Sequence, residues 1–329
     1  MGRILAAHAR VAATGMFVPE RVLTNADFEK LVDTNDEWIV QRTGIKTRHV
    51  VSEGEHASTL AFNAIDDLLE HHPDVKIETV DYILVASTTS DYVYPSLAAM
   101  IQDRFGIPTT AGALDISGAC AGFAYGINLA TGLLAGGQAT RVLVVAADAL
   151  TRSADYTDRS TCVLFGDGAG VVLVEQSETP GILGMTSGSD GSAGKYLFRT
   201  NFRFDINGTV DEKRLLRQDG RNVFRWVIEN IPNTIASILE RAGLTLDDID
   251  WFAPHSANLR MIEALNKRMG FPMEKTLLSV VDYGNTSAVS VPLALIPATR
   301  DGRVKSGDRI LVIGFGGGLV SAGNVLVWP

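Results

Sequence analysis

The chain has 329 residues, 46% of them hydrophobic and 20% charged, and a net charge of −9. This composition fits a large globular protein of two domains or one double-sized unit. The negative charge and the lack of a basic stripe argue against non-specific nucleic-acid binding. No apolar run approaches the ~20 residues that span a bilayer, and residues 1–10 lack the continuous apolar core of a signal peptide. Two cysteines, Cys120 and Cys162, give no disulfide framework, so a cytoplasmic location is expected.

Strand-like and helix-like segments alternate along the chain, which predicts an α/β fold. Strands are predicted at residues 9–18, 80–86, 141–147, 249–253 and 309–314, with a strand pair around residues 162–175. Helices are predicted at residues 24–31, 36–44, 57–71, 95–105 and 120–136, and again from Asn258.

The second half of the sequence resembles the first. The matching stretches are residues 77–87 with 244–255, residues 141–146 with 309–314, and the segment after Cys120 with the segment after Asn285. Any two α/β halves share some likeness, so chance similarity is the alternative. If the duplication is real, halves 1–178 and 179–329 pack as one body. Cys120, His255 and Asn285 then lie at corresponding strand ends that face a shared cleft.

Cys120 opens a helix-length segment that carries almost no charge. A thiol in the first turn of a helix lies among unpaired N–H groups at the positive end of the dipole, which favours the nucleophilic thiolate. The alternative is a small buried hydrophobic residue.

Three further features could complete a site with this thiol. His255 follows a strand and opens a helix, which suits a cleft, although a structural histidine is the alternative. Asn285 lies in a glycine-containing segment that also suits a simple turn. The glycines of residues 314–318 allow close approach of backbone N–H groups to a ligand. Leu319 replaces the last glycine of a dinucleotide-binding motif, which disfavours an oxidoreductase, and no Cys/His spacing indicates a metal site.

Six motifs, in this order, resemble those of β-ketoacyl-acyl-carrier-protein synthase III, a condensing enzyme of the thiolase superfamily. They are Thr34–Gly44, Cys120–Phe123, Asp158–Gly170, Pro254–Arg260, Tyr283–Ser287 and Phe315–Gly318. The resemblance runs from about residue 10 to the C-terminus. It implies two duplicated βα halves in a layered α-β-α-β-α core, a homodimer, and a coenzyme A thioester as substrate with no further cofactor.

The resemblance also implies an activity, the initiation of type II fatty-acid synthesis. Cys120 would take an acyl group from a short acyl-coenzyme A, and malonyl-acyl-carrier protein would then lose CO₂ and attack it, giving a 3-oxoacyl-carrier protein. His255 and Asn285 would donate hydrogen bonds to the enolate oxygen. The N–H groups of Cys120 and Gly317 would form the oxyanion hole.

Binding residues carry over by the same resemblance. Coenzyme A would contact Thr34, Trp38, Arg42, Arg159, Phe224 and Asn258. The acyl pocket would include Leu164, Phe165 and, from the partner of the dimer, Tyr94. The carrier protein would dock on Arg225, Ser256, Arg260, Lys267 and Arg268. Ser256 and Tyr94 stand where many relatives have glutamine and phenylalanine, which leaves the length and branching of the acyl group open.

Two other functions stay possible at this point. A coenzyme A-dependent ketosynthase or acyltransferase of secondary metabolism would share Cys120 and His255 but use another acceptor. A non-catalytic acyl-coenzyme A-binding protein would bind the ligand without forming a thioester.

Overall fold

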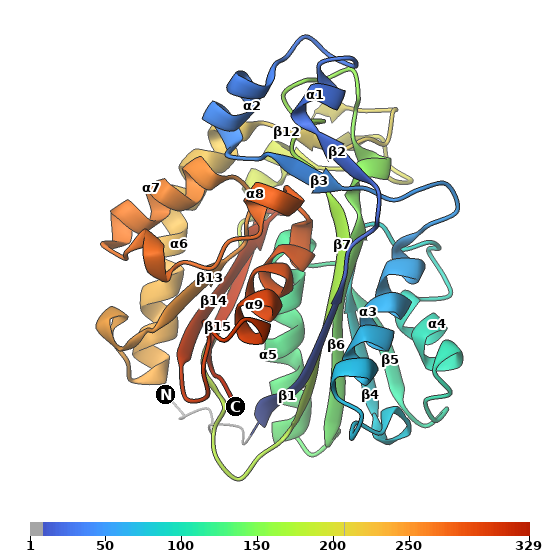
Figure 1. Ribbon diagram of the computed structural model, residues 1–329, viewed down its shortest axis with the longest axis vertical. Coiled ribbons are helices and arrows are strands. Elements are labelled where there is room, and N and C mark those ends of the chain that lie inside the picture. Colours follow the sequence, from blue (N-terminus) through green and yellow to red (C-terminus); the bar gives the residue numbers. More distant parts are fainter. Residues whose placement is uncertain (1–8, 207) are drawn as a thin grey trace.

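The computed structural model describes residues 9–206 and 208–329. Residues 1–8, most of the segment in which the sequence predicts no signal peptide, lie outside the described residues, as does residue 207. The described chain forms five layers, in which helices cover both outer faces of two sheets and also separate them (Figure 1). This is the layered α/β architecture that the sequence predicts.

The first sheet has five strands, with β6 at its centre. Their order is β1 (Ala9–Phe17), β7 (Asp167–Gln176), β6 (Arg141–Ala149), β4 (Tyr82–Ala86) and β5 (Gly112–Ile116). β4 runs parallel to both β5 and β6, and the other neighbours are antiparallel. Helices α3 (Ala57–His71) and α4 (Leu97–Arg104) pack on the outer face of this sheet.

The second sheet repeats the pattern of the first. Its order is β13 (Trp251–Pro254), β14 (Arg309–Gly316), β15 (Val320–Val327) and β8 (Ile182–Ser189). β13 and β14 are parallel, as β4 and β6 are, and the remaining pairs are antiparallel. Helices α6 (Gly220–Ala242) and α7 (Leu259–Met269) cover its outer face. The strand order β8-β15-β14-β13 thus matches β1-β7-β6-β4, and the predicted boundary after residue 178 lies in the connection from β7 to β8.

Helices α5 (Gly122–Ala135) and α9 (Ser290–Arg300) form the middle layer between the two sheets. They join both sheets in one hydrophobic core. α5 can lie close to the first sheet because Gly126 has no side chain: a Cβ there would come 2.6 Å from Cγ1 of Val144. Cys120 and Asn285 both lie just before these helices, so the two middle helices bring the starts of two distant segments to the same end of the core.

Short elements cover that end of the molecule (top of Figure 1). They are α1 (Asn25–Phe28), α2 (Asp36–Thr43), α8 (Val280–Tyr283), and the strand pairs β2 (Val22–Thr24) with β3 (Thr47–His49), β9 (Leu197–Phe198) with β12 (Arg217–Gln218), and β10 (Asp205–Ile206) with β11 (Thr209–Val210). α2 begins where Asn35 Oδ1 accepts the N–H of Trp38, and it ends at Gly44, whose φ of 76° suits glycine.

The predicted strand pair at residues 162–175 is wrong. β7 is the only strand there, and Cys162 lies in a turn before it. The turn cannot extend into a strand because its backbone pairs with Asn285: the Asn285 N–H donates to the Leu164 carbonyl, and the Gly166 N–H donates to the Asn285 carbonyl. The helix predicted at residues 24–31 is also shorter, since α1 ends at Phe28.

Candidate active site

A cavity of about 580 Å³ opens at the covered end of the core and is lined from both halves of the chain. Cys120, His255, Asn285 and Gly317 all line it. These four residues span almost 200 positions of sequence, so the fold, not local sequence, brings them together. The roles assigned to them remain predictions, but the meeting of their positions in one cavity is a property of the structure.

Cys120 lies in a 3₁₀ turn, Ala119–Ala121, immediately before α5. The backbone of β14 passes directly against it. A Cβ on Gly316 would come 2.8 Å from the Cys120 sulfur, a distance that real side chains do not adopt. Glycine at position 316 is therefore required for the N–H of the next residue, Gly317, to lie beside the thiol.

The surroundings of Cys120 oppose the expectation that the helix start favours a thiolate. Burial raises the pKa of the Cys120 thiol to about 11, and the negative charge of Asp148 adds to the rise. Hydrogen bonds from the Ser287 side chain and from the N–H groups of Cys120 and Gly317 oppose it. Desolvation outweighs these donors, so the resting thiol is neutral. The two backbone donors are the ones predicted for the oxyanion hole.

His255 follows β13 and is buried, and its N–H donates to the Ile313 carbonyl at 2.7 Å. Its Nδ1 is 2.7 Å from Oγ of Ser290, and the same oxygen accepts the N–H of Ser256 at 3.1 Å. When the Ser290 hydroxyl donates to Nδ1, the proton of the neutral ring lies on Nε2, the nitrogen that a ligand oxygen would meet. Burial lowers the pKa of His255 to about 3, so the imidazole is neutral at physiological pH.

Asn285 is fixed at its backbone and at its amide oxygen. The backbone bonds to Leu164 and Gly166 measure 2.8 Å and 3.1 Å. Its Oδ1 accepts the N–H of Ser287 at 3.0 Å. Because the oxygen is engaged, the amide nitrogen is the group available to a ligand in the cavity, and it donates without titrating.

Two arginine side chains, those of Arg42 and Arg159, lie against the indole ring of Trp38. The Arg42 guanidinium carbon lies 4.9 Å from the Trp38 ring centroid, and that of Arg159 lies 5.3 Å from it. Arg159 also donates to the carbonyl of Asp33 and pairs with its carboxylate. Both guanidinium groups therefore lie close to the indole ring, and a flat aromatic ligand would stack between an arginine and the indole only after displacing that arginine.

The other residues predicted to bind coenzyme A are divided by the structure. Trp38, Arg42, Phe224 and Asn258 line the cavity, whereas Thr34 and Arg159 lie outside its lining. Asn258 caps α7, since its Oδ1 accepts the N–H of Arg260, and its amide nitrogen donates to the Arg42 carbonyl. It therefore joins α7 to α2 at the mouth of the cavity.

Leu164 and Phe165 line the cavity, as predicted for an acyl pocket. Tyr94 does not: it lies in the connection from β4 to α4, it is 85% exposed, and it is outside the lining of its own chain's cavity. This exposure is compatible with the predicted contact to a partner's pocket.

The prediction that Ser256 belongs to the docking surface is wrong. It is 0% exposed, its hydroxyl accepts the N–H of Ser279, and its own N–H donates to Ser290. It cannot reach a partner protein. The other residues predicted for docking are exposed and are Arg225 on α6 with Arg260, Lys267 and Arg268 on α7. Arg260 is partly neutralised by Glu263 at 2.9 Å.

Several residues of the site were missed in the sequence. Asp148 is fully buried, and its Oδ1 accepts the N–H of Thr88 at 2.7 Å and the hydroxyls of Thr88 and Thr89 at 2.9 Å and 3.0 Å. It thereby fixes the loop whose Thr88 lines the cavity. Arg199 and Arg221 also line it. Only Ser290 left a sequence signal, a hydroxyl in an otherwise apolar helical run.

Within the described residues, no group of three or more His, Cys, Asp or Glu side chains could hold a metal ion. In the same part of the chain, no helix is both long and apolar enough to cross a membrane.

Comparisons with known proteins identify the family of the chain. Family models described as "3-Oxoacyl-[acyl-carrier-protein (ACP)] synthase III" and its "C terminal" part match residues 114–191 and 239–328. The chain is 48% identical over 323 residues to "Beta-ketoacyl-[acyl-carrier-protein] synthase III 2" of Bacillus subtilis, covering 97% of this chain and 98% of that protein. The chain belongs to the 3-oxoacyl-[acyl-carrier-protein] synthase III family.

Solved structures support this membership. The synthase III of Thermus thermophilus superposes with a TM-score of 0.93 at 43% identity, covering 97% of this chain and 99% of that one. The priming β-ketosynthase of the R1128 polyketide pathway superposes with a TM-score of 0.91 at 36% identity, covering 98% and 96%. The thiolase-like fold and the family predicted from the six motifs are therefore confirmed.

Proposed function

We propose that the protein is an acyltransferase that condenses a short acyl-coenzyme A with malonyl-acyl-carrier protein, the first step of type II fatty-acid synthesis. The observation that carries this proposal is the meeting of a thiol, a neutral histidine and an oriented amide in one cavity with the Gly317 N–H. A nucleophile, two enolate donors and an oxyanion donor are the groups that the reaction requires.

In the first half-reaction Cys120 attacks the carbonyl carbon of the acyl-coenzyme A thioester. The new C–S bond forms to the Cys120 sulfur, the old C–S bond breaks, and the thiol proton ends on the departing coenzyme A. The N–H groups of Cys120 and Gly317 stabilise the tetrahedral oxyanion. Because the pKa of the free thiol is about 11, the negative charge has to be stabilised as it forms, and not beforehand.

In the second half-reaction the malonyl thioester loses CO₂ and becomes an enolate. Nε2–H of His255 and the amide nitrogen of Asn285 donate to its oxygen, each donor lowering the barrier by about 3 kcal/mol. The enolate carbon attacks the acyl-Cys120 carbonyl, and the released cysteine takes up one proton. A histidine with a pKa of about 3 suits this role because it keeps one N–H and no charge throughout the neutral range.

Both substrates are polyanionic or acidic, and the cavity mouth carries cations to match. Trp38 with Arg42 and Arg159 would hold the adenine and phosphates of coenzyme A. Arg225, Lys267 and Arg268, with Arg260 at the rim, would attract the acidic carrier protein. Coenzyme A enters as a thioester substrate, and we include no resident cofactor.

We further propose a homodimer in the cytoplasm. β5 is the edge strand of the first sheet, and its Leu114 is 49% exposed. The loop before α4, which exposes Tyr92, Val93 and Tyr94, is bound to the same strand, because the N–H groups of Leu97 and Ala98 donate to Asp115. An edge strand flanked by exposed aromatic residues is the kind of surface that a second copy covers.

Radiolabelled acyl-coenzyme A tests the nucleophile. Wild-type protein should retain label after denaturation, and Cys120→Ala should retain none. Cys162→Ala is the matched control, because Cys162 is the other cysteine and lies outside the cavity lining. Undiminished labelling of Cys120→Ala would refute the assignment, and intact mass without an acyl adduct on wild type would indicate a non-catalytic binding protein.

A second candidate is a priming ketosynthase of secondary metabolism. The likeness to the R1128 priming β-ketosynthase favours it. Release of CO₂ from malonyl-carrier protein measured with the carrier proteins of the two kinds of pathway would separate the candidates.

A further inference from the structure

Arg48, in the middle of β3, is a charged side chain that is 0% exposed. In the described part of the chain its guanidinium donates only to neutral acceptors. Nε donates to the carbonyl of Val163 at 3.0 Å, Nη2 donates to the same carbonyl, and Nη1 donates to Oδ1 of Asn25 at 2.6 Å. Its face lies 4.5 Å from the centroid of the Phe28 ring. A buried cation that pairs with no carboxylate is costly, so its presence calls for a structural reason.

Arg48 donates to the carbonyl of Val163, the residue that precedes Leu164, to which the Asn285 backbone is hydrogen-bonded. The next carbonyl, that of Leu164, accepts the Asn285 N–H at 2.8 Å. Two N–H groups of one planar guanidinium converge on Val163, which fixes the orientation of this peptide more strictly than a single bond would. The position of the Asn285 backbone therefore depends on the peptide that Arg48 clamps.

The aliphatic stem of Arg48 fills the space behind the same junction. A Cβ on Gly284 would come 3.1 Å from Cγ of Arg48, and a Cβ on Gly166 would come 3.3 Å from its Cβ. These two glycines flank the paired segments that carry Asn285. Arg48 thus supports Asn285 through packing as well as through hydrogen bonds.

The other end of the guanidinium is linked to α2. The amide nitrogen of Asn25 donates to Asp36 at 2.8 Å and to the carbonyl of Ile45 at 2.9 Å. Asp36 is the first residue of the helix that carries Trp38. Burial lowers the pKa of Arg48 only to about 10, so the guanidinium stays charged at neutral pH and keeps all of these donors.

We propose that Arg48 is a positioning residue for Asn285, which holds the donor amide where the malonyl thioester oxygen arrives and ties it to the helix that binds coenzyme A. The proposal rests on the role of Asn285 in the proposed function. It assigns Arg48 to the decarboxylation half-reaction, because Asn285 serves that step and not the transfer of the acyl group to Cys120.

The two half-reactions can be measured separately. Acylation of Cys120 is followed by intact mass after mixing with acyl-coenzyme A, and decarboxylation by CO₂ release from malonyl-carrier protein. Arg48→Met keeps the length of the stem and removes the donors. We expect it to slow decarboxylation by about tenfold or more, as loss of the Asn285 donor would, and to change acylation by less than about threefold.

Three further variants make the result decisive. Asn285→Ala sets the ratio expected when the donor itself is absent. Leu68→Ala, in the 0% exposed interior of α3, is a destabilised control that should leave the ratio of the two rates unchanged. Arg48→Lys keeps the charge but lacks the planar fork that donates twice to one carbonyl. It should likewise slow decarboxylation more than acylation, and it replaces Arg48→Met in the test if that variant does not fold.

The outcomes separate the two levels of the proposal. If Asn285→Ala slows both half-reactions equally, the assigned role of Asn285 is wrong, and the role of Arg48 is wrong with it. If Asn285→Ala slows decarboxylation selectively but the folded Arg48 variant slows both steps equally, or neither, then Arg48 is merely a core residue. Selective loss in both variants supports the positioning role.

Discussion

The imidazole of His255 is kept neutral by its surroundings, and this has a measurable cost at low pH. Its pKa falls from 6.5 in the unfolded chain to about 3 in the folded one, so below pH 6.5 the unfolded state binds a proton that the folded state does not. The stability associated with neutral His255 is complete above pH 6.5 and is lost as the pH falls toward 3.

This linkage predicts the behaviour of His255→Asn. Between pH 7 and pH 5 the free energy of unfolding of the wild type should fall by about 2 kcal/mol more than that of the variant, at 1.36 kcal/mol per pH unit below pH 6.5. Urea unfolding at the two pH values measures the difference, in which other titrating groups cancel. Parallel pH curves would mean that the folded histidine titrates normally.

Ser290 is the hydrogen-bond partner of Nδ1 in the same ring, so its hydroxyl should matter for chemistry. Ser290→Ala removes the donor to Nδ1 and the acceptor of the Ser256 N–H. We expect decarboxylation to slow about tenfold to a hundredfold and acylation of Cys120 to change less. This is below the roughly hundredfold to thousandfold effect of a lost oxyanion donor, because Ser290 acts only through His255. Thr131→Val, which removes another fully buried hydroxyl that bonds only within α5, is the control. An equal effect of both variants would refute the assignment.

The residues that could be predicted from sequence are those whose role follows from their own type and local position. Cys120, His255 and Asn285 each stand at the start of a segment, within a recognisable motif. Asp148 and Arg48 left no sequence signal, and the hydroxyl of Ser290 in an apolar helical run did not reveal its partner. The importance of all three depends on contacts with residues far away: Ser290 with His255, Asp148 with Thr88, Arg48 with Val163. The raised pKa of Cys120 was missed because burial outweighs the local helix start.

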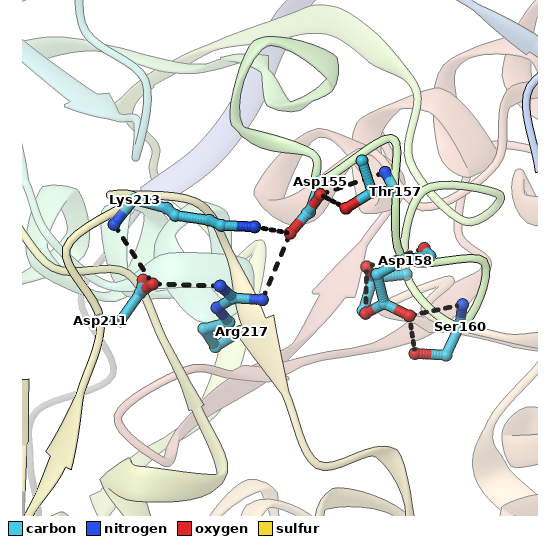
Figure 2. Close-up of polar contacts among 8 residues, drawn as sticks. Asp155, Thr157, Asp158, Ser160, Asp211, Lys213 and Arg217 are labelled. Atoms are coloured by element: carbon cyan, nitrogen blue, oxygen red, sulfur yellow. Dashed lines mark hydrogen bonds and ion pairs between the residues drawn. The ribbon is translucent and has the colours of Figure 1, made fainter.

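At the scale of elements, ion pairs connect the segment from β9 to β12 with Asp155 (Figure 2). Arg217 lies between Asp155 at 3.3 Å and Asp211 at 3.1 Å, and Lys213 reaches Asp155 at 3.5 Å. Both carboxylates are buried, so these pairs are less screened than surface pairs. The Leu216 N–H also donates to the Ser153 carbonyl, which adds a backbone link between the β9–β12 segment and residues 153–155.

Asp155→Asn should loosen this segment without unfolding the core. The amide keeps the size of the side chain but loses the charge that holds Lys213 and Arg217. We expect faster limited proteolysis between residues 199 and 218 and a higher KM for acyl-coenzyme A, since Arg199, Leu216 and Gln218 line the cavity. Asp205→Asn is the matched control, because Asp205 pairs with Arg203 within the segment and makes no link across. Equal proteolysis in both variants would contradict the tether.

Strands and helices with clear apolar periodicity were predicted well, as α3, β4 and β6 illustrate. The wrong strand at residues 162–166 has a physical cause. Residues 162–166 are apolar enough for a strand, yet their backbone is committed to Asn285, more than a hundred positions away, and no local pattern records that pairing. The order of strands within each sheet likewise depends on contacts between distant segments.

At the scale of the whole molecule, the exposed edge formed by β5 and the loop before α4 predicts the assembly. Leu114→Lys places a charge on that edge and should shift the protein from dimer to monomer in sedimentation velocity. It should also reduce activity if Tyr94 closes the partner's pocket. Leu31→Lys replaces a leucine that is 55% exposed and lies three residues after α1, an element that is apart from β5 in Figure 1, and should leave the dimer intact. A dimer that persists in Leu114→Lys would place the interface elsewhere.

The arrangement of the site across the two sheets has a consequence for the newly synthesised chain. The proposed nucleophile is translated at residue 120, but the proposed enolate donors follow at residues 255 and 285 and the proposed second oxyanion donor at residue 317. A nascent chain therefore carries an unassisted thiol on the ribosome until both halves have emerged and docked. Cellular thioesters meet a competent catalyst only after folding is complete, so the first acylation of the enzyme reports that its two halves have found each other.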